Sequence, residues 1–320
     1  MVAKSMGPIK LDTEVASLLS QFPVASQADL RAETLEAWRA GELPMDPLSG
    51  EVERVDHISR DEPRLSARIH TFKNGDPKNR PCVYSIHGGG YVAGSVDFDD
   101  ELFDKMCRET NCVGISIDYR LAPENPYPIP LEDCYAGLAW VFENAEDLGI
   151  DPSRIGIHGI SGGGGLAAAL ALLVRDRGDY QLAYQALDCP MLDDRQITPS
   201  SQADELVGWS KLSNAFGWRS YLGDLYGTDE VPYLAAPARA TDLSNLPPAY
   251  VCVGGADGFR DEDIKYAMLL EECGTPCELH VYPGAPHGVM LFKTTDIGSR
   301  YVRDKLHWLK LKIETARAAG

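Results

Sequence analysis

The fold of this chain is decided by the stretch RIGIHGISGGGGLAAAL, residues 154–170. Residues 154–158 have the apolar pattern of a buried strand, and a helix rich in small residues is predicted at 163–175. Ser161 lies on the turn between them, in the pattern Gly159-Ile160-Ser161-Gly162-Gly163. A turn this sharp holds the serine at positive φ, so the residues two positions before and after it must lack a Cβ atom. Gly159 and Gly163 meet this requirement.

The alternation of strands and helices continues on both sides of this stretch. Residues 51–73 predict two strands that turn around Asp61-Glu62-Pro63. Further strands are predicted at 82–86, 112–118, 184–189, 249–253 and 277–282, and helices at 131–145, 261–273 and 296–316. Such alternation is typical of a mainly parallel sheet with helices on both faces. We therefore predict an α/β fold.

Two segments lie outside this alternation. Residues 12–41 predict helices, because apolar residues such as Val15, Leu18 and Leu35 recur at helical intervals. Residues 191–247 carry aromatic residues on short helical pieces and interrupt the strand-helix order. We expect a helical cap segment at 1–48 and one α/β domain at 49–320, with an insertion at about 191–247 that caps the carboxyl edge of the sheet.

Composition excludes several classes of function. The 320 residues carry a formal charge of -18, and a nucleic-acid site needs clustered Lys and Arg. No run of about 18 apolar residues predicts a membrane span, and residues 1–8 lack an apolar segment like that of a secretory signal. We expect a cytoplasmic protein without stable membrane association. The eight cysteines form no C-x-x-C pair, which favours buried thiols over disulfides.

Ser161 requires partners, because a serine hydroxyl is a weak nucleophile without a base and the base requires a carboxylate that orients it. Among seven histidines, His287 follows the last predicted strand in a loop at the carboxyl edge of the sheet. Asp257 follows the strand at 249–253, which gives the chain order Ser, Asp, His expected on this sheet. Asp261 is the alternative acid, but its place at the start of a predicted helix favours a capping role.

A glycine-rich loop, His87-Gly88-Gly89-Gly90-Tyr91, follows the predicted strand at 82–86. Its backbone N–H groups can approach a ligand closely and hold the oxyanion of a tetrahedral intermediate, worth about 2.7–4 kcal/mol per donor. We predict Gly88, Gly89 and Gly162 as these donors, and His87 as a brace of the loop. Phosphate binding is the alternative, but neither G-x-x-x-x-G-K-[ST] nor G-x-G-x-x-G spacing is present.

Candidates for a substrate pocket are Tyr91, Ile160, Trp209 and Phe216. Aromatic residues in a cap pack against its own helices as often as they line a pocket. No closely spaced set of histidines and carboxylates predicts a metal site.

From about residue 80 to the end, the sequence resembles the hormone-sensitive-lipase-like family of esterases, also called bacterial family IV. The resemblance rests on His87-Gly88-Gly89-Gly90, on Asp118–Glu124 with Pro126-Tyr127-Pro128, on the serine turn, on Asp257–Glu262 and on His287-Gly288. The chain departs from residues usual in the family at Ile160, Gly162 and Gly258. None of these departures removes a reacting group.

The resemblance implies an α/β-hydrolase fold with an eight-stranded, mostly parallel sheet flanked by helices and a cap built from the N-terminal segment and the insertion. Residues 49–320 would then be the catalytic domain. It also implies hydrolysis of carboxylic esters with short- to medium-chain acyl groups by a Ser-His-Asp triad, through an acyl-enzyme and without a cofactor. Arg120 and Glu124 would form a salt-bridged support.

Two alternatives remain beside the hydrolysis of small-molecule esters. The same triad serves hydrolysis of amides, lactones and carbamates. From a different class, the chain would be a small-molecule receptor that kept the fold, which a complete triad disfavours. Dimers are common among similar proteins, so a homodimer is a further expectation.

Overall fold

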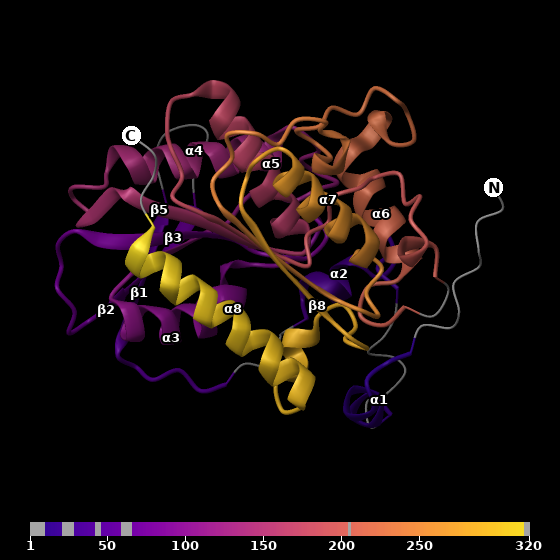
Figure 1. The fold of residues 1–320 in the computed structure, drawn as a ribbon, viewed down its shortest axis with the longest axis horizontal. Coiled ribbons are helices and arrows are strands. Elements are labelled where there is room, and N and C mark those ends of the chain that lie inside the picture. Colours follow the sequence, from indigo (N-terminus) through magenta and orange to yellow (C-terminus); the bar gives the residue numbers. More distant parts are fainter. Residues whose placement is uncertain (1–9, 21–28, 42–45, 59–65, 204–205, 317–320) are drawn as a thin grey trace.

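An eight-stranded sheet runs through the computed structural model, which describes residues 10–20, 29–41, 46–58, 66–203 and 206–316 (Figure 1). The strand order is β1-β2-β4-β3-β5-β6-β7-β8. The strands are β1 (Val52–Ile58), β2 (Ser66–Phe72), β3 (Arg80–Ile86), β4 (Val113–Ile117), β5 (Ile150–Ile160), β6 (Gln185–Asp188), β7 (Ala249–Gly254) and β8 (Cys277–Tyr282). Strand β2 is antiparallel to both of its neighbours, β1 and β4. All other neighbouring strands, from β4 across the sheet to β8, pair in parallel. The predicted mostly parallel sheet is confirmed.

Helices cover both faces of the sheet, with α4, α5 and α7 on one face and α3 and α8 on the other (Figure 1). The helices are α1 (Thr13–Leu19), α2 (Leu35–Arg39), α3 (Asp100–Thr110), α4 (Ile129–Glu143), α5 (Gly162–Arg177), α6 (Lys211–Leu222), α7 (Arg260–Glu272) and α8 (Asp296–Thr315). The predicted helices at 131–145, 163–175, 261–273 and 296–316 agree with α4, α5, α7 and α8 to within two residues at each end.

Helix α3 was missed by the sequence analysis, although its buried residues Phe103, Met106 and Cys107 recur at helical intervals. Most of its other residues are polar or charged, and this hid the pattern. The predicted strand at 154–158 is also longer in the structure, because β5 extends to Ile150 and Ile160. The turn predicted around residues 61–63 lies outside the described residues.

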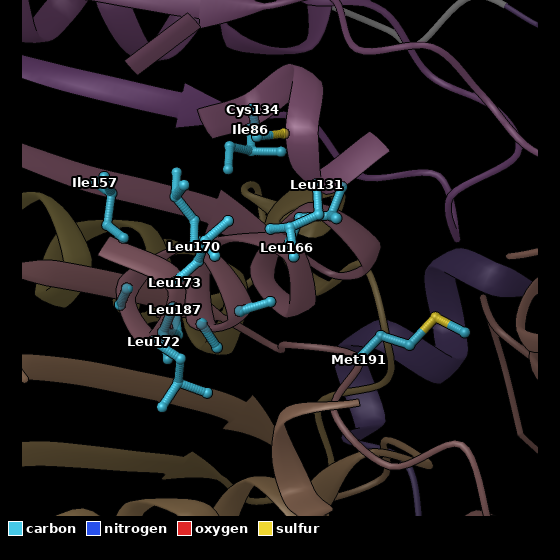
Figure 2. Packing of buried hydrophobic residues seen from close by; sticks show 14 of the residues in the cluster. Ile86, Leu131, Cys134, Ile157, Leu166, Leu170, Leu172, Leu173, Leu187 and Met191 are labelled. Atoms are coloured by element: carbon cyan, nitrogen blue, oxygen red, sulfur yellow. The ribbon is translucent and has the colours of Figure 1, made fainter. Parts of the chain in front are cut away.

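Helix α5 fixes the centre of the molecule, since all its residues from Gly162 to Val174 are buried. Figure 2 shows Leu166 and Leu170 of this helix in one hydrophobic cluster with Ile157 of β5 and Leu187 of β6. Burying a leucine side chain stabilises a fold by about 1.5–3 kcal/mol, so this packing holds the helix firmly against the sheet. Ser161, which directly precedes the helix, is thereby held in place at the N-terminus of α5.

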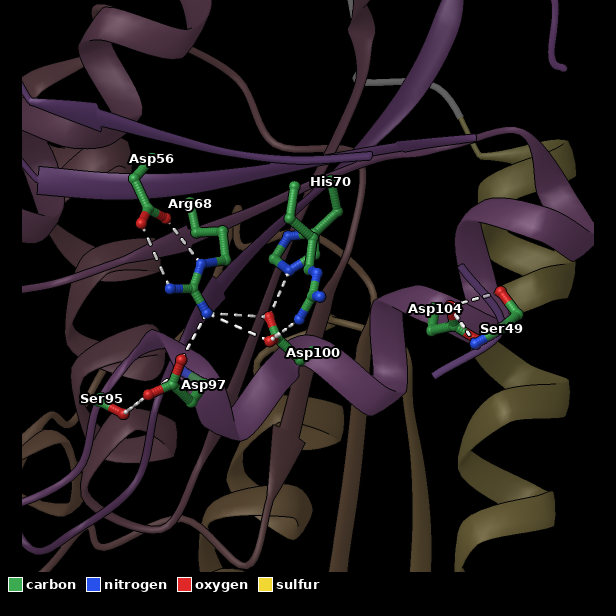
Figure 3. Close-up of polar contacts among 9 residues, drawn as sticks. Ser49, Asp56, Arg68, His70, Ser95, Asp97, Asp100 and Asp104 are labelled. Carbon is green, nitrogen blue, oxygen red and sulfur yellow. Dashed lines mark hydrogen bonds and ion pairs between the residues drawn. The ribbon is translucent and has the colours of Figure 1, made fainter. Parts of the chain in front are cut away.

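A polar network ties β1 and β2 to α3 (Figure 3). The Arg68 guanidinium donates to Asp56 Oδ1 at 2.7 Å and to Asp97 Oδ1 at 2.5 Å. At its centre, Asp100 accepts from Arg54 at 2.7 Å and contacts His70 Nε2 at 2.8 Å. We call the six residues of these contacts the β2 network: Arg54, Asp56, Arg68, His70, Asp97 and Asp100.

The N-terminal segment and the insertion contact each other. The N–H of Leu30 donates to Ser213 Oγ at 2.9 Å, and the Ser210 hydroxyl donates to Asp29 Oδ1 at 2.5 Å. The rings of Trp38 and Trp209 meet edge to face with centroids 6.0 Å apart. These contacts agree with a cap built from both segments. The division into a cap segment at 1–48 and a catalytic domain at 49–320 stays a prediction.

The cysteines are unpaired thiols throughout the described residues, and six of the eight are buried, while Cys273 and Cys277 are partly buried. None of the helices in the described ranges combines the length with the apolar composition that a bilayer crossing requires.

Candidate active site

Ser161 occupies the strained turn predicted for it, with φ 57° and ψ -118°, between the end of β5 and the start of α5. A Cβ atom on Gly159 would lie 2.2 Å from the carbonyl oxygen of Gly163. A Cβ atom on Gly163 would lie 2.1 Å from the carbonyl oxygen of Ile86. Because both obstacles are backbone atoms that cannot move aside, the turn requires glycine at these two positions.

The three predicted triad residues lie together in the structure. Ser161 Oγ is 2.9 Å from His287 Nε2, and His287 Nδ1 is 2.8 Å from Asp257 Oδ2. Asp257 follows β7 and His287 follows β8. Since β5, β7 and β8 run in parallel, their carboxyl ends share one edge of the sheet, where ligands of such folds bind.

Neighbouring backbone and rings hold this chain of contacts. Asp257 Oδ1 accepts a hydrogen bond from the N–H of Phe259 at 3.0 Å, and the ring of Phe259 stands edge-on to His287 at 5.0 Å. A Cβ atom on Gly208 would lie 2.4 Å from the carbonyl oxygen of His287. With a carboxylate as its acceptor, Nδ1 carries the imidazole hydrogen and Nε2 presents its lone pair to Ser161.

The alternative acid, Asp261, lies in the first turn of α7 but does not cap it. Its Oδ2 accepts the N–H of Ser200 in the insertion at 2.8 Å, so its role is to attach the insertion to the helix. Sequence analysis missed a second attachment, Glu262. This buried side chain accepts the N–H groups of Leu192 and Asp193 at 2.9 and 3.1 Å. Burial raises the pKa of the Glu262 carboxyl well above its usual value.

The glycine-rich loop lies directly against the serine turn. A Cβ atom on Gly88 would lie 3.4 Å from the Ser161 Cβ, and one on Gly162 would lie 2.9 Å from the backbone nitrogen of Tyr91. Within the described part of the chain, the N–H groups of Gly88 and Gly89 have no protein acceptor. They are thus available to a ligand beside Ser161.

His87 braces this loop. Its ring stacks on Tyr119 with centroids 4.3 Å apart, and its Nδ1 lies 2.8 Å from the carbonyl oxygen of Gly88. Burial lowers the pKa of His87, which keeps the ring neutral.

The predicted pocket residues lie in different surroundings. Trp209 is buried, with its ring 6.2 Å from that of His287 and in contact with Gly90. Ile160 and Phe216 are half-buried against the core. Tyr91 is 1% exposed, donates its hydroxyl to the carbonyl of Met191 at 2.9 Å and stacks on an α6 tyrosine, so its contacts are those of a packing residue.

Arg120 and Glu124 are each salt-bridged, as expected, to a residue on another element of the fold. Arg120 forms a bidentate ion pair with Asp133 at 2.7 and 2.8 Å. Glu124 accepts from Arg39 of α2 at 2.7 and 2.9 Å. Glu124 therefore holds the N-terminal helix α2 against the sheet domain, and its partner Arg39 is too distant in sequence to be inferred from spacing.

An eight-stranded sheet with a serine at positive φ after β5, and a Ser-His-Asp contact chain at its carboxyl edge, defines the class of α/β hydrolases. A family model described as alpha/beta hydrolase fold matches residues 83–291. The chain belongs to this family and, within it, to the carboxylic-ester hydrolases of the hormone-sensitive-lipase-like group.

Similar proteins carry esterase names. Esterase LipI of Mycobacterium tuberculosis is 35% identical over 283 residues, which cover 87% of each chain. Carboxylesterase NlhH of the same species is 38% identical over 217 residues, covering 67% of this chain and 68% of that protein. A solved structure titled Bacterial Heroin Esterase superposes with a TM-score of 0.87 at 34% identity, over 96% of this chain and 99% of that chain.

Proposed function

We propose that this enzyme hydrolyses carboxylic esters with short- to medium-chain acyl groups through an acyl-enzyme on Ser161. The observation that carries the proposal is the contact chain itself, 2.9 Å from Ser161 Oγ to His287 Nε2 and 2.8 Å from His287 Nδ1 to Asp257 Oδ2. Each of the three groups has the partner that its role in acyl transfer requires.

Acylation begins when His287 Nε2 removes the Ser161 proton and Oγ attacks the ester carbonyl. Asp257 keeps the hydrogen on Nδ1 and stabilises the imidazolium that forms. The N–H groups of Gly88, Gly89 and Gly162 hold the oxyanion, at about 2.7–4 kcal/mol per donor. The imidazolium then protonates the oxygen of the departing alcohol, which leaves the acyl group on Ser161.

Deacylation repeats these steps with water. His287 Nε2 removes a proton from a water molecule, and the oxygen of that water attacks the acyl carbonyl. The imidazolium returns the proton to Ser161 Oγ as the carboxylic acid leaves. No proton or electron is consumed over the cycle, so this route calls for no cofactor.

A preference for short to medium acyl chains is supported by the enclosure of the reacting groups. Ser161 is 5% exposed and the His287 side chain 10% exposed. Trp209 lies beside His287, and Trp38 from the N-terminal segment lies against Trp209. A panel of p-nitrophenyl esters of increasing acyl length tests this preference, and amide, lactone and carbamate analogues test the alternative substrates.

Replacing the nucleophile tests the mechanism. Ser161→Ala is expected to lower kcat on p-nitrophenyl butyrate by on the order of 10⁴-fold or more, because the bond-forming atom is gone. Ser153→Ala is the matched control, since Ser153 also lies on β5 but bonds to Asp151 at the other end of the strand. Its activity should equal that of the wild type. Turnover by Ser161→Ala near the wild-type rate, in a folded protein, would show that another group is the nucleophile.

The partner on this proposal is a small-molecule ester. A homodimer, a cytoplasmic location and the absence of stable membrane association stay predictions. A receptor function is tested by a fluorophosphonate probe, which should label Ser161 if the serine is activated.

A further inference from the structure

A third potential metal ligand lies beside the acid-base pair of the candidate site. The sulfur of Cys189, a carboxylate oxygen of Asp257 and a ring nitrogen of His287 all lie within 4.8 Å of one another. Cys189 is 2% exposed and Asp257 1% exposed. Ester hydrolysis uses Asp257 and His287 and gives Cys189 no role.

The position of Cys189 is fixed by its backbone. It directly follows β6 and has φ 40°, which is uncommon for a residue with a side chain. Its N–H donates to the carbonyl oxygen of Cys252 on β7 at 2.7 Å. The thiol is thus held in its place next to Asp257 before any ligand arrives.

The surroundings of Cys189 are negatively charged. Asp188 directly precedes it in the chain and Asp257 lies beside it, and both carboxylates are buried. Lys305 pairs with Asp188, and this leaves the charge of Asp257 without a cationic side chain among its described contacts. A field of this sign disfavours a bare thiolate and favours a cation that binds together with it.

We propose that Cys189, Asp257 and His287 form an inhibitory Zn²⁺ site. The inference rests on the proposed function, because the metal would take two residues of the same triad. Sulfur, nitrogen and carboxylate oxygen are the donors that zinc uses in proteins, at about 2.0–2.3 Å. Tetrahedral ligands at such bond lengths lie about 3.3–3.8 Å apart, so shifts on the order of 1 Å bring these three donors to the distances of a zinc site.

Binding rearranges two protons. The Cys189 thiol loses its proton to solvent as the Zn–S bond forms. The Nδ1 hydrogen of His287 is replaced by the metal, and Nε2 takes up a hydrogen, so the ring stays neutral. One proton is released for each zinc ion bound. Nε2 is then a donor and no longer accepts the Ser161 proton, which stops ester hydrolysis.

Inhibition by zinc tests the site in the active enzyme. Hydrolysis of p-nitrophenyl butyrate is followed with increasing ZnCl₂, and each variant is normalised to its own zinc-free rate. We expect the wild type to be inhibited reversibly, with activity restored by EDTA, and Cys189→Ser to need at least tenfold more zinc for half inhibition. Cys252→Ser, which changes a buried cysteine on the neighbouring strand, should behave as the wild type does. Equal inhibition of Cys189→Ser and the wild type would overturn the proposal.

Calorimetry on Ser161→Ala tests binding without activity and without altering Cys189. Titration of ZnCl₂ in two weakly chelating buffers of different ionisation enthalpy should give one site and release of one proton per zinc ion. Binding without proton release would exclude the thiolate and overturn the site. If the wild type lacks ester hydrolysis while Ser161→Ala still binds zinc with proton release, the proposed function fails and the zinc site stands.

Discussion

Two short histidine-aspartate contacts lie among the described residues, and only one of these pairs also contacts a nucleophile. His287 and Asp257 lie 2.8 Å apart at the carboxyl edge of the sheet, and His70 and Asp100 lie 2.8 Å apart in the β2 network. The second ring nitrogen of His287 is 2.9 Å from Ser161 Oγ. The second ring nitrogen of His70 is buried and has no hydrogen-bond partner among the described residues.

The two carboxylates also differ in their other contacts. Asp257 accepts one further hydrogen bond, from a backbone N–H. Asp100 is buried, which alone would raise its pKa, but hydrogen bonds from His70 and Arg54 and the charge of Arg68 lower the pKa to about 2. A short His–Asp contact is therefore not by itself a catalytic feature. The pair at the sheet edge has a nucleophile on its open nitrogen, whereas Asp100 is engaged by two arginines.

The largest expected effect separates the two pairs by activity. Asp257→Asn should lower kcat by about 10⁴-fold, because an amide no longer fixes the His287 tautomer or stabilises the imidazolium. Asp100→Asn should leave kcat on p-nitrophenyl butyrate within about threefold of the wild type, since α3 and β2 contribute no reacting group. Steady-state kinetics on both purified variants measures the difference.

As a control, circular dichroism on the same samples shows whether both variants are folded. A comparable fall in kcat for the two variants would mean that the β2 network acts on the active site and that the two pairs do not differ in function.

Removing the charge of Asp100 is expected to have a smaller effect, on the free energy of unfolding, and this effect depends on pH. The pKa of Asp100 is about 2 in the folded protein, against 3.8 for an ordinary aspartate side chain. The unfolded chain therefore binds more protons between these values, so the contribution of Asp100 is fully present above about pH 4 and is lost as the pH falls through about 2. By linkage this contribution is about 2 kcal/mol.

Urea unfolding of the wild type and Asp100→Asn at pH 7, 5 and 3 measures the contribution of Asp100 to the unfolding free energy. The difference in unfolding free energy should be about 2 kcal/mol at pH 7 and 5 and smaller at pH 3. A difference that does not change between pH 7 and pH 3 would assign the effect to packing and not to the charge of Asp100.

The sequence was sufficient for the parts of the site that depend on local backbone. Glycines at 159 and 163 predict the serine turn because backbone atoms fill the space that a Cβ atom would need. His287 and Asp257 could be predicted from their places after parallel strands, because such loops meet at one edge. The order of the helices and strands followed from apolar periodicity, except in α3, where charged residues dilute the pattern.

Contacts between distant segments could not be predicted in this way. The pairing of His70 with Asp100 depends on how α3 lies on β2, which residue spacing does not reveal. Cys189 shares no sequence neighbourhood with Asp257 or His287, so no spacing revealed that the three donors meet. Glu124 was expected to belong to a salt-bridged support, and only the docking of α2 shows that its partner is Arg39.

The smallest effect is expected for the Arg39–Glu124 ion pair. This pair is exposed, whereas Asp100 is buried. The hydrogen bond from Arg39 lowers the pKa of Glu124 to about 2. The Glu124 side chain is nevertheless 57% exposed, so water screens the pair and its worth is about 0–1 kcal/mol. Glu124→Gln should therefore lower the urea unfolding free energy by less than about 1 kcal/mol, and less still in 1 M NaCl.

Arg39 also donates to the backbone carbonyls of Val92 and Ala122 at 2.9 and 3.0 Å, and these bonds remain in Glu124→Gln. Arg39→Met removes these two hydrogen bonds as well as the ion pair. It should therefore lower the unfolding free energy by more than Glu124→Gln does, since two buried carbonyls lose a charged donor. If Glu124→Gln costs as much as Asp100→Asn, exposure does not decide the strength of these ion pairs. The contrast between the β2 network and the surface of the cap would then need another cause, such as cooperative docking of α2 with the sheet domain.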